Sequence, residues 1–277
     1  MNNKEAYSAY MDATNTPGSN KAGSYKKALD LLALIMSRKS INDVSDFWSI
    51  DSPKEIADLY DFALQHQSDE SGVFQAKGLP PSYGANRFYS AALKSYGHFL
   101  WGHQLDQIYE QSSLTSKQIG KKLEREHRKA PEIFLYEPTT NREGQDTKRE
   151  TNARLGQDYF RKMILREYRG ACCVTGLDVA SLLRASHISS WASDKANRLN
   201  PANGLCLSAT YDAAFDKHLI SFDDDYRMVV SPVLAEHYNK QTARDYFQAF
   251  EGMKISMPMR HPPDLELLKK HRDQLVT

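Results

Sequence analysis

Four residues in the C-terminal half of the chain have types and a spacing that suit the hydrolysis of a phosphodiester bond. They are His187, Asn203, Asp212 and Asp216. Because a neutral imidazole can take a proton from water near pH 7, His187 suits the role of general base. Asp212 and Asp216 are four positions apart, so a helix would place both carboxylates on one face. Hard oxygen ligands of this kind favour one divalent ion, magnesium or manganese.

Each of the four residues also has a purely structural interpretation. An isolated histidine is more often a hydrogen-bonded structural residue than a catalyst. Asp212 could complement a helix dipole, Asp216 could pair with Lys217, and Asn203 begins an ordinary Asn-Gly turn. The combination of all four favours the catalytic interpretation, in which the Asn203 amide orients the histidine or pins a loop.

The apolar and polar patterns predict a strand, a loop, a second strand and a helix around these residues. Residues 182–188 form a short apolar run that ends near the histidine, and residues 205–207 form another. The polar segment 194–202 predicts a connecting loop. Residues 210–219 have helical spacing, with Thr210 as the expected N-cap.

Further elements are expected after this unit. Residues 219–231 alternate around three aspartates at 223–225, which predicts a β-hairpin whose aspartates form a turn and not a second metal site. Residues 265–275 predict a closing helix. His218 has no role in this scheme and is expected to be solvated. Three cysteines give neither a disulfide framework nor a zinc ribbon, so we expect reduced core residues at Cys172, Cys173 and Cys206.

The sequence around these residues resembles the HNH nucleases, and most strongly a bacterial restriction-type branch of them. The shared pattern is L-L-x-A-S-H-I-x-x-W, N-G-L and D-x-x-F-D, preceded by R-x-G-Q-x-x-F-R and C-x-T-G. It covers roughly Arg154 to Pro232, with a weaker echo at His271 and Arg272. The resemblance implies a two-stranded hairpin followed by one helix, gripping a single divalent ion.

Two positions depart from that family pattern. Many HNH nucleases have Asp or His just before the base, where it supplies a further ligand, but this chain has Ser186. Others have His at the position of Asp212 or just before it, where this chain has Tyr211. A carboxylate in place of the softer imidazole favours magnesium or manganese over nickel or zinc.

Positive charge is concentrated ahead of the proposed site. The net charge is only +1, but between Lys117 and Arg184 basic residues outnumber acidic ones by five. Such a surplus can contact phosphates and steer DNA inward. For the basic residues of segment 121–129, a solvated helix face paired with Glu124 and Glu126 is an equally good interpretation. The residues expected to bind DNA are Arg154, Gln157, Arg161 and Lys162.

The first half of the chain has a different character. Residues 25–37, 53–65 and 87–101 have apolar residues at helical spacing, and the aromatic residues among them are expected in a core. Residues 130–152 contain prolines, Asn and Gly, which predict a linker. We therefore expect an α+β protein in two domains: a helical domain over 1–140, for DNA recognition or dimerisation, and a ββα-metal nuclease domain with flanking helices and a hairpin over 141–277.

These features predict a metal-dependent DNA endonuclease, most plausibly a type II-like restriction enzyme that acts on double-stranded DNA as a homodimer. One alternative is a nonspecific or modified-DNA-dependent defence nuclease. The other is an inactive DNA-binding protein on an HNH scaffold, which Ser186 and Tyr211 make credible. No apolar run approaches the roughly 18 residues that a transmembrane helix requires, and the first residues lack the apolar core of a signal peptide. A cytoplasmic location is expected.

Overall fold

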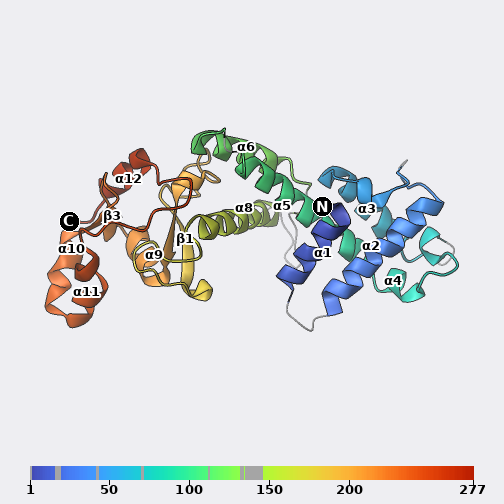
Figure 1. The fold of residues 1–277 in the computed structure, drawn as a ribbon, viewed down its shortest axis with the longest axis horizontal. Coiled ribbons are helices and arrows are strands. Elements are labelled where there is room, and N and C mark those ends of the chain that lie inside the picture. The colour runs from blue at the N-terminus through green and yellow to red at the C-terminus, as the bar shows by residue number, and fades with distance from the viewer. Residues whose placement is uncertain are drawn as a thin grey trace. The chain divides into compact units, whose positions relative to one another are not determined.

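The computed structural model describes residues 2–15, 20–41, 44–69, 72–111, 113–131, 134 and 146–277, with side chains in the last range from residue 156 onward. The described part of the chain is helical up to residue 182 and adds small antiparallel strand pairs after it (Figure 1), so the expected α+β class is confirmed. The chain divides into two compact units. Residues 1–107 and 129–152 form the first, and residues 108–128 and 153–277 form the second.

The first unit is helical, and it confirms the three helices expected there. Its helices are α1 (Asn3–Thr14), α2 (Asn20–Arg38), α3 (Pro53–His66), α4 (Pro81–Ala85) and most of α5 (Phe88–Tyr109), with 3-10 turns at Phe47–Ser49 and Val73–Gln75. Ser52 caps α3 by accepting a hydrogen bond from the backbone N–H of Glu55, and Pro53 occupies the first turn.

Aromatic side chains form much of the core of this unit. Tyr7, Phe47, Tyr89 and Tyr96 are fully buried, and the Tyr7 ring meets the Tyr96 ring edge-on with centroids 5.2 Å apart. Edge-to-face contacts of this kind stabilise a core beyond the area they bury. The expectation of a core position is confirmed for Tyr89 and Tyr96, the two of these residues that lie in a predicted helix.

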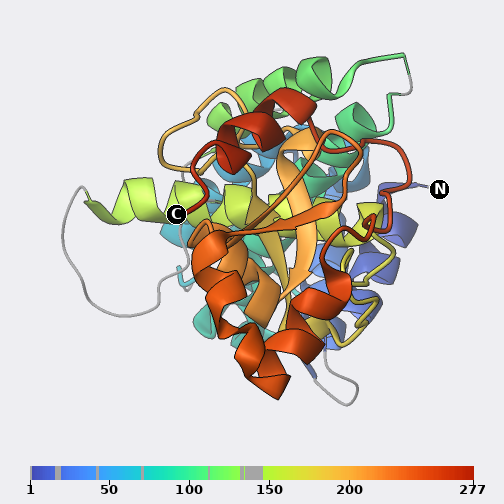
Figure 2. The ribbon, with the colours of Figure 1, turned by 90° about the vertical axis from the view of Figure 1, so that its left-hand side faces the viewer.

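The second unit contains the expected order of strand, loop, strand and helix. Strand β1 (Leu183–His187) pairs antiparallel with β2 (Gly204–Ser208), in a register that places His187 opposite Gly204. Figure 2 shows the two strands side by side. Helix α9 (Ala209–Asp216) follows β2 without a linker and packs on both strands.

The prediction that Thr210 caps α9 is wrong. The N-cap is Ser208, the last residue of β2, and its side chain makes no capping hydrogen bond. The reason is that the strand runs directly into the helix, so the change from extended to helical backbone takes place at Ser208, and Thr210 already lies inside the first turn.

The hairpin and the closing helix are confirmed. Strands β3 (Ile220–Phe222) and β4 (Met228–Val230) pair antiparallel, and the Asp223 carboxylate accepts hydrogen bonds from the backbone N–H groups of Asp225 and Arg227 at 2.9 and 2.7 Å. The aspartates therefore form a turn. The chain continues through α10 (Pro232–Ala235), 3-10 turns at Glu236–Asn239 and Gln248–Phe250, α11 (Gln241–Tyr246) and α12 (Leu265–Arg272).

Two helices from earlier in the chain complete the second unit. They are α6 (Ser116–Arg128) and α8 (Asp146–Glu167), the latter from residue 153 onward. A Cβ on Gly120 of α6 would lie 2.8 Å from the Cα of Asn200, so α6 rests directly on the backbone before β2. A Cβ on Gly204 would lie 2.4 Å from the Ile164 side chain, so β2 begins against α8.

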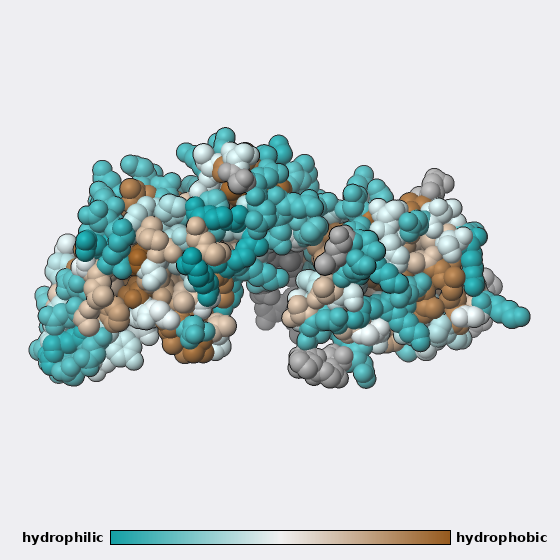
Figure 3. Space-filling model, viewed as in Figure 1, coloured by the Kyte–Doolittle hydropathy of each residue, from teal (hydrophilic) through white to brown (hydrophobic). Residues whose placement is uncertain are grey.

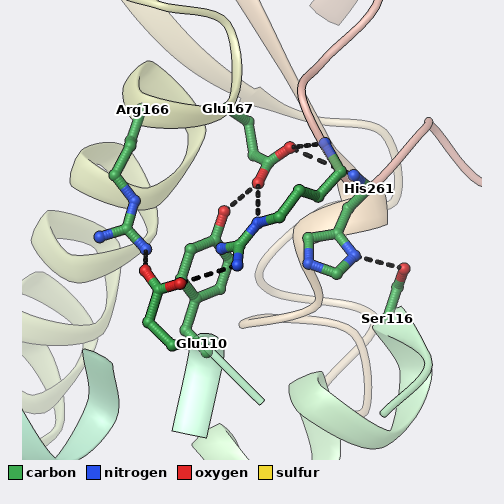
Figure 4. A network of polar contacts seen from close by, with 7 residues as sticks. Glu110, Ser116, Arg166, Glu167 and His261 are labelled. Carbon is green, nitrogen blue, oxygen red and sulfur yellow. Dashed lines mark hydrogen bonds and ion pairs between the residues drawn. The ribbon is translucent and has the colours of Figure 1, made fainter. Parts of the chain in front are cut away.

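An ionic cluster around the buried Glu167 also joins distant segments of this unit (Figure 4). Glu167 is fully buried, and its carboxylate accepts hydrogen bonds from the Tyr109 hydroxyl and from the backbone N–H groups of Arg260 and His261. Burial alone would raise the pKa of Glu167, but these hydrogen bonds outweigh it and lower the pKa. Glu110 pairs with both Arg166 and Arg260, at 2.5 and 2.8 Å.

The surface is mostly hydrophilic on the face drawn in Figure 3, with apolar residues in scattered patches. Exposed large apolar side chains of the second unit include Leu182, Tyr246 and Met253. Among the helices that the structure describes, none is long and apolar enough to cross a membrane.

Candidate active site

His187 lies at the end of β1, with its ring held on two sides. The ring stacks on Phe160 of α8, with centroids 3.7 Å apart, and meets Trp191 edge-on at 5.5 Å. Nε2 lies 3.0 Å from the carbonyl oxygen of Arg198. Since a carbonyl oxygen can only accept, Nε2 carries the proton and Nδ1 of the neutral ring keeps its lone pair.

The environment of His187 keeps the imidazole neutral. Burial lowers the pKa of His187 to about 4, an effect that the Arg198 carbonyl opposes and the Arg198 charge reinforces. Nδ1 has no hydrogen-bond partner among the residues that the structure describes. The ring therefore offers an unprotonated nitrogen across the neutral pH range, which is what a general base requires.

Asn203 is fully buried and fixes the loop between the two strands. Its side-chain oxygen accepts a hydrogen bond from the backbone N–H of Ser189 at 2.8 Å. Its amide nitrogen donates to the carbonyl oxygens of Ser189 and Asn197, at 3.0 and 2.9 Å. The Asn203 amide thus pins both ends of the loop, while the partner that orients the His187 ring is the backbone carbonyl of Arg198.

Asp212 and Asp216 lie on α9 at the spacing of one helical turn. Burial and the neighbouring charge of Asp212 raise the pKa of Asp216, so the two carboxylates are close enough to repel each other. The hydroxyl of the buried Ser186, on β1, donates a hydrogen bond to Oδ1 of Asp212. Ser186 therefore supports the Asp212 carboxylate from the neighbouring strand.

One cavity brings the base and a carboxylate together. It has a volume of about 300 Å³, and both His187 and Asp216 line it. Asp212 does not line this cavity. Its charge is nevertheless close enough to Asp216 to raise the pKa of that residue. A larger cavity of about 540 Å³ lies at the other end of α9, beside Ser208 and Tyr211. It contains none of the four candidate residues.

The carboxylate pair fits a hard divalent cation. A cation beside the two carboxylates would relieve the repulsion that helps to raise the pKa of Asp216, and oxygen donors suit magnesium or manganese. Within the described ranges, no three His, Cys, Asp or Glu side chains form a group able to hold a metal ion. The protein would thus supply two ligands, leaving the other positions to water and substrate oxygens.

The four residues expected to bind DNA all belong to α8. Gln157 and Lys162 are exposed, whereas the Arg154 side chain lies outside the described residues. Arg161 is half-buried and donates to the carbonyl oxygens of Leu183 and Ala180, at 2.8 and 3.0 Å. These bonds attach the start of β1 to α8, so Arg161 has a structural task whether or not it also meets a phosphate.

The basic stretch on α6 makes ion pairs with neighbouring acidic residues. Arg128 pairs with Glu124 at 3.2 Å and Arg125 pairs with Glu126 at 3.4 Å. Both arginines are exposed, but Glu124 is buried, so only the Arg125–Glu126 pair is a surface pair of the kind that is worth little in stability.

His218 is less exposed to solvent than the sequence predicts. It is half-buried and lines the same cavity as His187, and its ring centroid lies 4.5 Å from that of His271. Its Nδ1 is buried and makes no hydrogen bond within the described part of the chain. The expectation of a solvated side chain is therefore wrong, because α12, far away in the sequence, covers it. The expectation for the cysteines is confirmed: all three are buried and free.

The comparisons with known proteins agree with this geometry. Residues 172–223 match the family model described as HNH endonuclease, and the matched segment contains β1, β2, α9 and all four candidate residues. No curated protein matches the chain. The restriction-type branch of the family is not distinguished by this match and stays a prediction. Over residues 172–223, which include its ββα segment, this chain is therefore similar to the HNH endonuclease family.

Proposed function

We propose that the chain is a metal-dependent DNA endonuclease of the restriction type, with His187 as its general base. One observation carries the proposal: His187, neutral and with an unpaired Nδ1, lines the same cavity as Asp216 of the carboxylate pair. A general base and a carboxylate that could hold a metal ion are the two parts that hydrolysis of a phosphodiester requires, and His187 and Asp216 bring them to one cavity.

His187 performs the proton transfer. Nδ1 takes a proton from a water molecule, whose oxygen forms a bond to phosphorus while the bond to the leaving sugar oxygen breaks. The leaving oxygen gains a proton from solvent. The hydrogen bond from Nε2 to the Arg198 carbonyl holds the tautomer and favours the ring as it gains charge, which is the usual task of a second group behind a catalytic histidine.

Asp212 and Asp216 hold the metal ion. When bound, a magnesium or manganese ion would neutralise charge on the phosphate and on the leaving oxygen. Ser186 directs Oδ1 of Asp212, so it acts through that carboxylate and not as a ligand. This hydrogen bond gives a reason for serine at position 186, where Asp or His is more usual in HNH nucleases.

Asn203 acts as a positioning residue. Its hydrogen bonds fix the backbone of Ser189, two residues after the base, and of Asn197, next to the Arg198 carbonyl that orients the base. Loss of this amide would move the carbonyl away from the ring.

DNA would be held by basic and polar side chains on α8. Gln157 and Lys162 are exposed and available, Arg154 extends the same helix, and Arg161 has N–H groups beyond the two that bind carbonyl oxygens. One HNH site cuts one strand, so a double-strand break requires two sites, and a homodimer supplies them. A restriction role follows from the sequence resemblance.

The test is a cleavage assay on supercoiled plasmid DNA with and without magnesium or manganese. Discrete linear fragments in the presence of the ion support a restriction enzyme. A smear supports a nonspecific nuclease, and cleavage of only methylated plasmid supports a modification-dependent one. DNA binding without cleavage under any of these conditions would mean that the HNH scaffold has lost its activity.

A further inference from the structure

The cavity that His187 and Asp216 line also has polar residues that the proposed mechanism does not use. They include Ser190, Ser193 and Lys270. Ser190 and Ser193 form a hydrogen-bonded pair of hydroxyls 2.8 Å apart. Lys270 comes from α12, more than fifty residues later in the chain than the base and outside the segment that matches the HNH family model.

Lys270 stands on a helix that is rigidly attached to the helix of the carboxylates. The neighbouring His271 is buried, and its ring stacks on Phe215 of α9 with centroids 3.7 Å apart and an interplanar angle of 4°. His271 Nε2 meets the Phe215 carbonyl oxygen at 3.1 Å, and Nδ1 meets the Ser221 hydroxyl at 3.0 Å. Phe215 immediately precedes Asp216, so the lysine and the carboxylate have a fixed spatial relationship.

Arg272 adds a second attachment of the same helix. Its guanidinium donates to the Phe222 carbonyl oxygen and to the Asp224 carboxylate, both at 2.8 Å. Leu268 is fully buried on the inner side of α12. The helix therefore presents Lys270 to the cavity from a docked and well-packed scaffold, as a functional cation needs.

The charge of Lys270 is not used inside the protein. Its side chain is exposed, and within the described part of the chain its ammonium makes no ion pair or hydrogen bond. The adjacent Lys269 is also exposed but does not line the cavity. The Lys270 ammonium lies on the wall of the cavity that His187 lines, so it can bind an anion that enters this cavity.

We propose that Lys270 is a positioning residue that binds a phosphate of the DNA backbone within this cavity and holds it against His187. This inference rests on the proposed function, because that function makes the phosphodiester the anion that enters the cavity. An ammonium acts as a compact point charge with three rotatable donors, which suits a phosphate oxygen whose exact direction changes during the reaction.

The first test is DNA binding, which does not depend on cleavage. Binding of a double-stranded oligonucleotide is measured by fluorescence anisotropy at several salt concentrations, in calcium or EDTA, for the full-length wild type, Lys270→Gln and Lys269→Gln. Each phosphate contact contributes about 0.9 to the slope of log affinity against log salt. We expect Lys270→Gln to reduce that slope by about 0.9 and Lys269→Gln to leave it nearly unchanged. Equal reductions in both variants, or none in Lys270→Gln, would overturn the proposal.

The second test is the single-turnover cleavage rate with saturating metal. Lys270→Gln should lower the rate roughly tenfold or more, the scale for losing a donor aimed at developing charge, while Lys270→Arg should restore most of it. A merely structural lysine would not show rescue by arginine together with an unchanged melting temperature. If wild type binds DNA but cuts none, the proposed endonuclease fails and the salt slope still decides whether Lys270 binds phosphate.

Discussion

The Ser186 hydroxyl on β1 donates a hydrogen bond to Oδ1 of Asp212 on α9. This bond crosses from the strand that carries the base to the helix that carries the carboxylates. It fixes the orientation of one carboxylate oxygen, while the other has no hydrogen-bond partner among the described residues and is available to the proposed metal ion. The strand with the proposed base and the helix with the proposed metal ligands are thus joined directly by Ser186. This is the residue that departs from the pattern of the HNH nucleases.

Ser186→Ala should weaken metal binding more than it slows chemistry. Without the hydroxyl, the Asp212 carboxylate loses its orienting donor but keeps its charge. Outer-shell partners of metal ligands are typically worth tenfold to a hundredfold in affinity or activity. We expect the magnesium concentration at half-maximal cleavage to rise about tenfold, with the rate at saturating magnesium near that of wild type. Ser181→Ala, at an exposed position, is the control. An unchanged magnesium dependence would show that the hydrogen bond does not matter for the metal.

Removal of the base should stop cleavage while sparing DNA binding. His187→Ala should lower the single-turnover rate by about a hundredfold or more, as expected for loss of a general base. The stacking of the ring on Phe160 is lost as well, so we expect a stability cost of about 1 kcal/mol or more in urea unfolding. Substitution of the exposed His237 by alanine should change neither quantity. Near-normal turnover in His187→Ala would remove this residue from the mechanism.

The stability of the second unit should fall as the pH is lowered below 6.5. Burial, aided by the charge of His218, lowers the pKa of His271 to about 4, and burial lowers the pKa of His187 to about 4. Between pH 6.5 and 4 the unfolded chain binds protons at these two positions that the folded chain does not. Each therefore removes up to about 1.4 kcal/mol of stability per pH unit across that interval.

Urea unfolding at pH 7, 6 and 5 measures this dependence. The choice of pH 5 as the lower limit keeps Glu167 ionised, since its pKa lies below the usual value. His271→Gln should be less stable than wild type at pH 7 and should lose less stability on acidification. Equal stability of the wild type at pH 7 and pH 5 would show that neither histidine is buried as described.

The nuclease half should need residues 108–128 to fold. Gly120 rests on Asn200, and Ser116 meets His261 Nδ1 at 3.0 Å, so α6 covers backbone close to the active-site loop. A fragment 108–277 should unfold cooperatively and keep the metal site, whereas a fragment 141–277 should not. If the first unit reads bases, fragment 108–277 should cut with little site preference; discrete sites identical to those of the full chain would place recognition in the nuclease half.

The ββα unit could be predicted from the sequence because its signals are local. Alternation and turn residues mark β1, β2 and the loop between them, and the helical spacing of Asp212 and Asp216 marks α9. The prediction of Thr210 as the N-cap was wrong because β2 leads straight into α9. No turn separates the two elements, so the helix begins earlier than the polar residue suggests. The predicted domain boundary near residue 140 lies outside the described residues and stays a prediction.

What could not be predicted depends on contacts between segments far apart in the chain. His218 looks solvated until α12 is seen to cover it. The hydrogen bonds from Arg161 to the carbonyl oxygens of Leu183 and Ala180 give it a structural task that its place in the sequence does not indicate. Lys270 is one of many lysines in the sequence, and only the docking of its helix through His271 gives it a place in the cavity.

The most direct test of the account is the metal dependence of plasmid cleavage by the wild type, Asp212→Asn and Asp216→Asn. Wild type should cut in magnesium or manganese, stop in EDTA and resume when the ion is restored. Asp212→Asn should abolish cleavage and weaken manganese binding measured by calorimetry, and Asp216→Asn should give a similar or smaller loss, because two oxygen ligands share the ion. Undiminished DNA cleavage by the wild type in EDTA, or by Asp212→Asn in magnesium, would contradict the metal site proposed here.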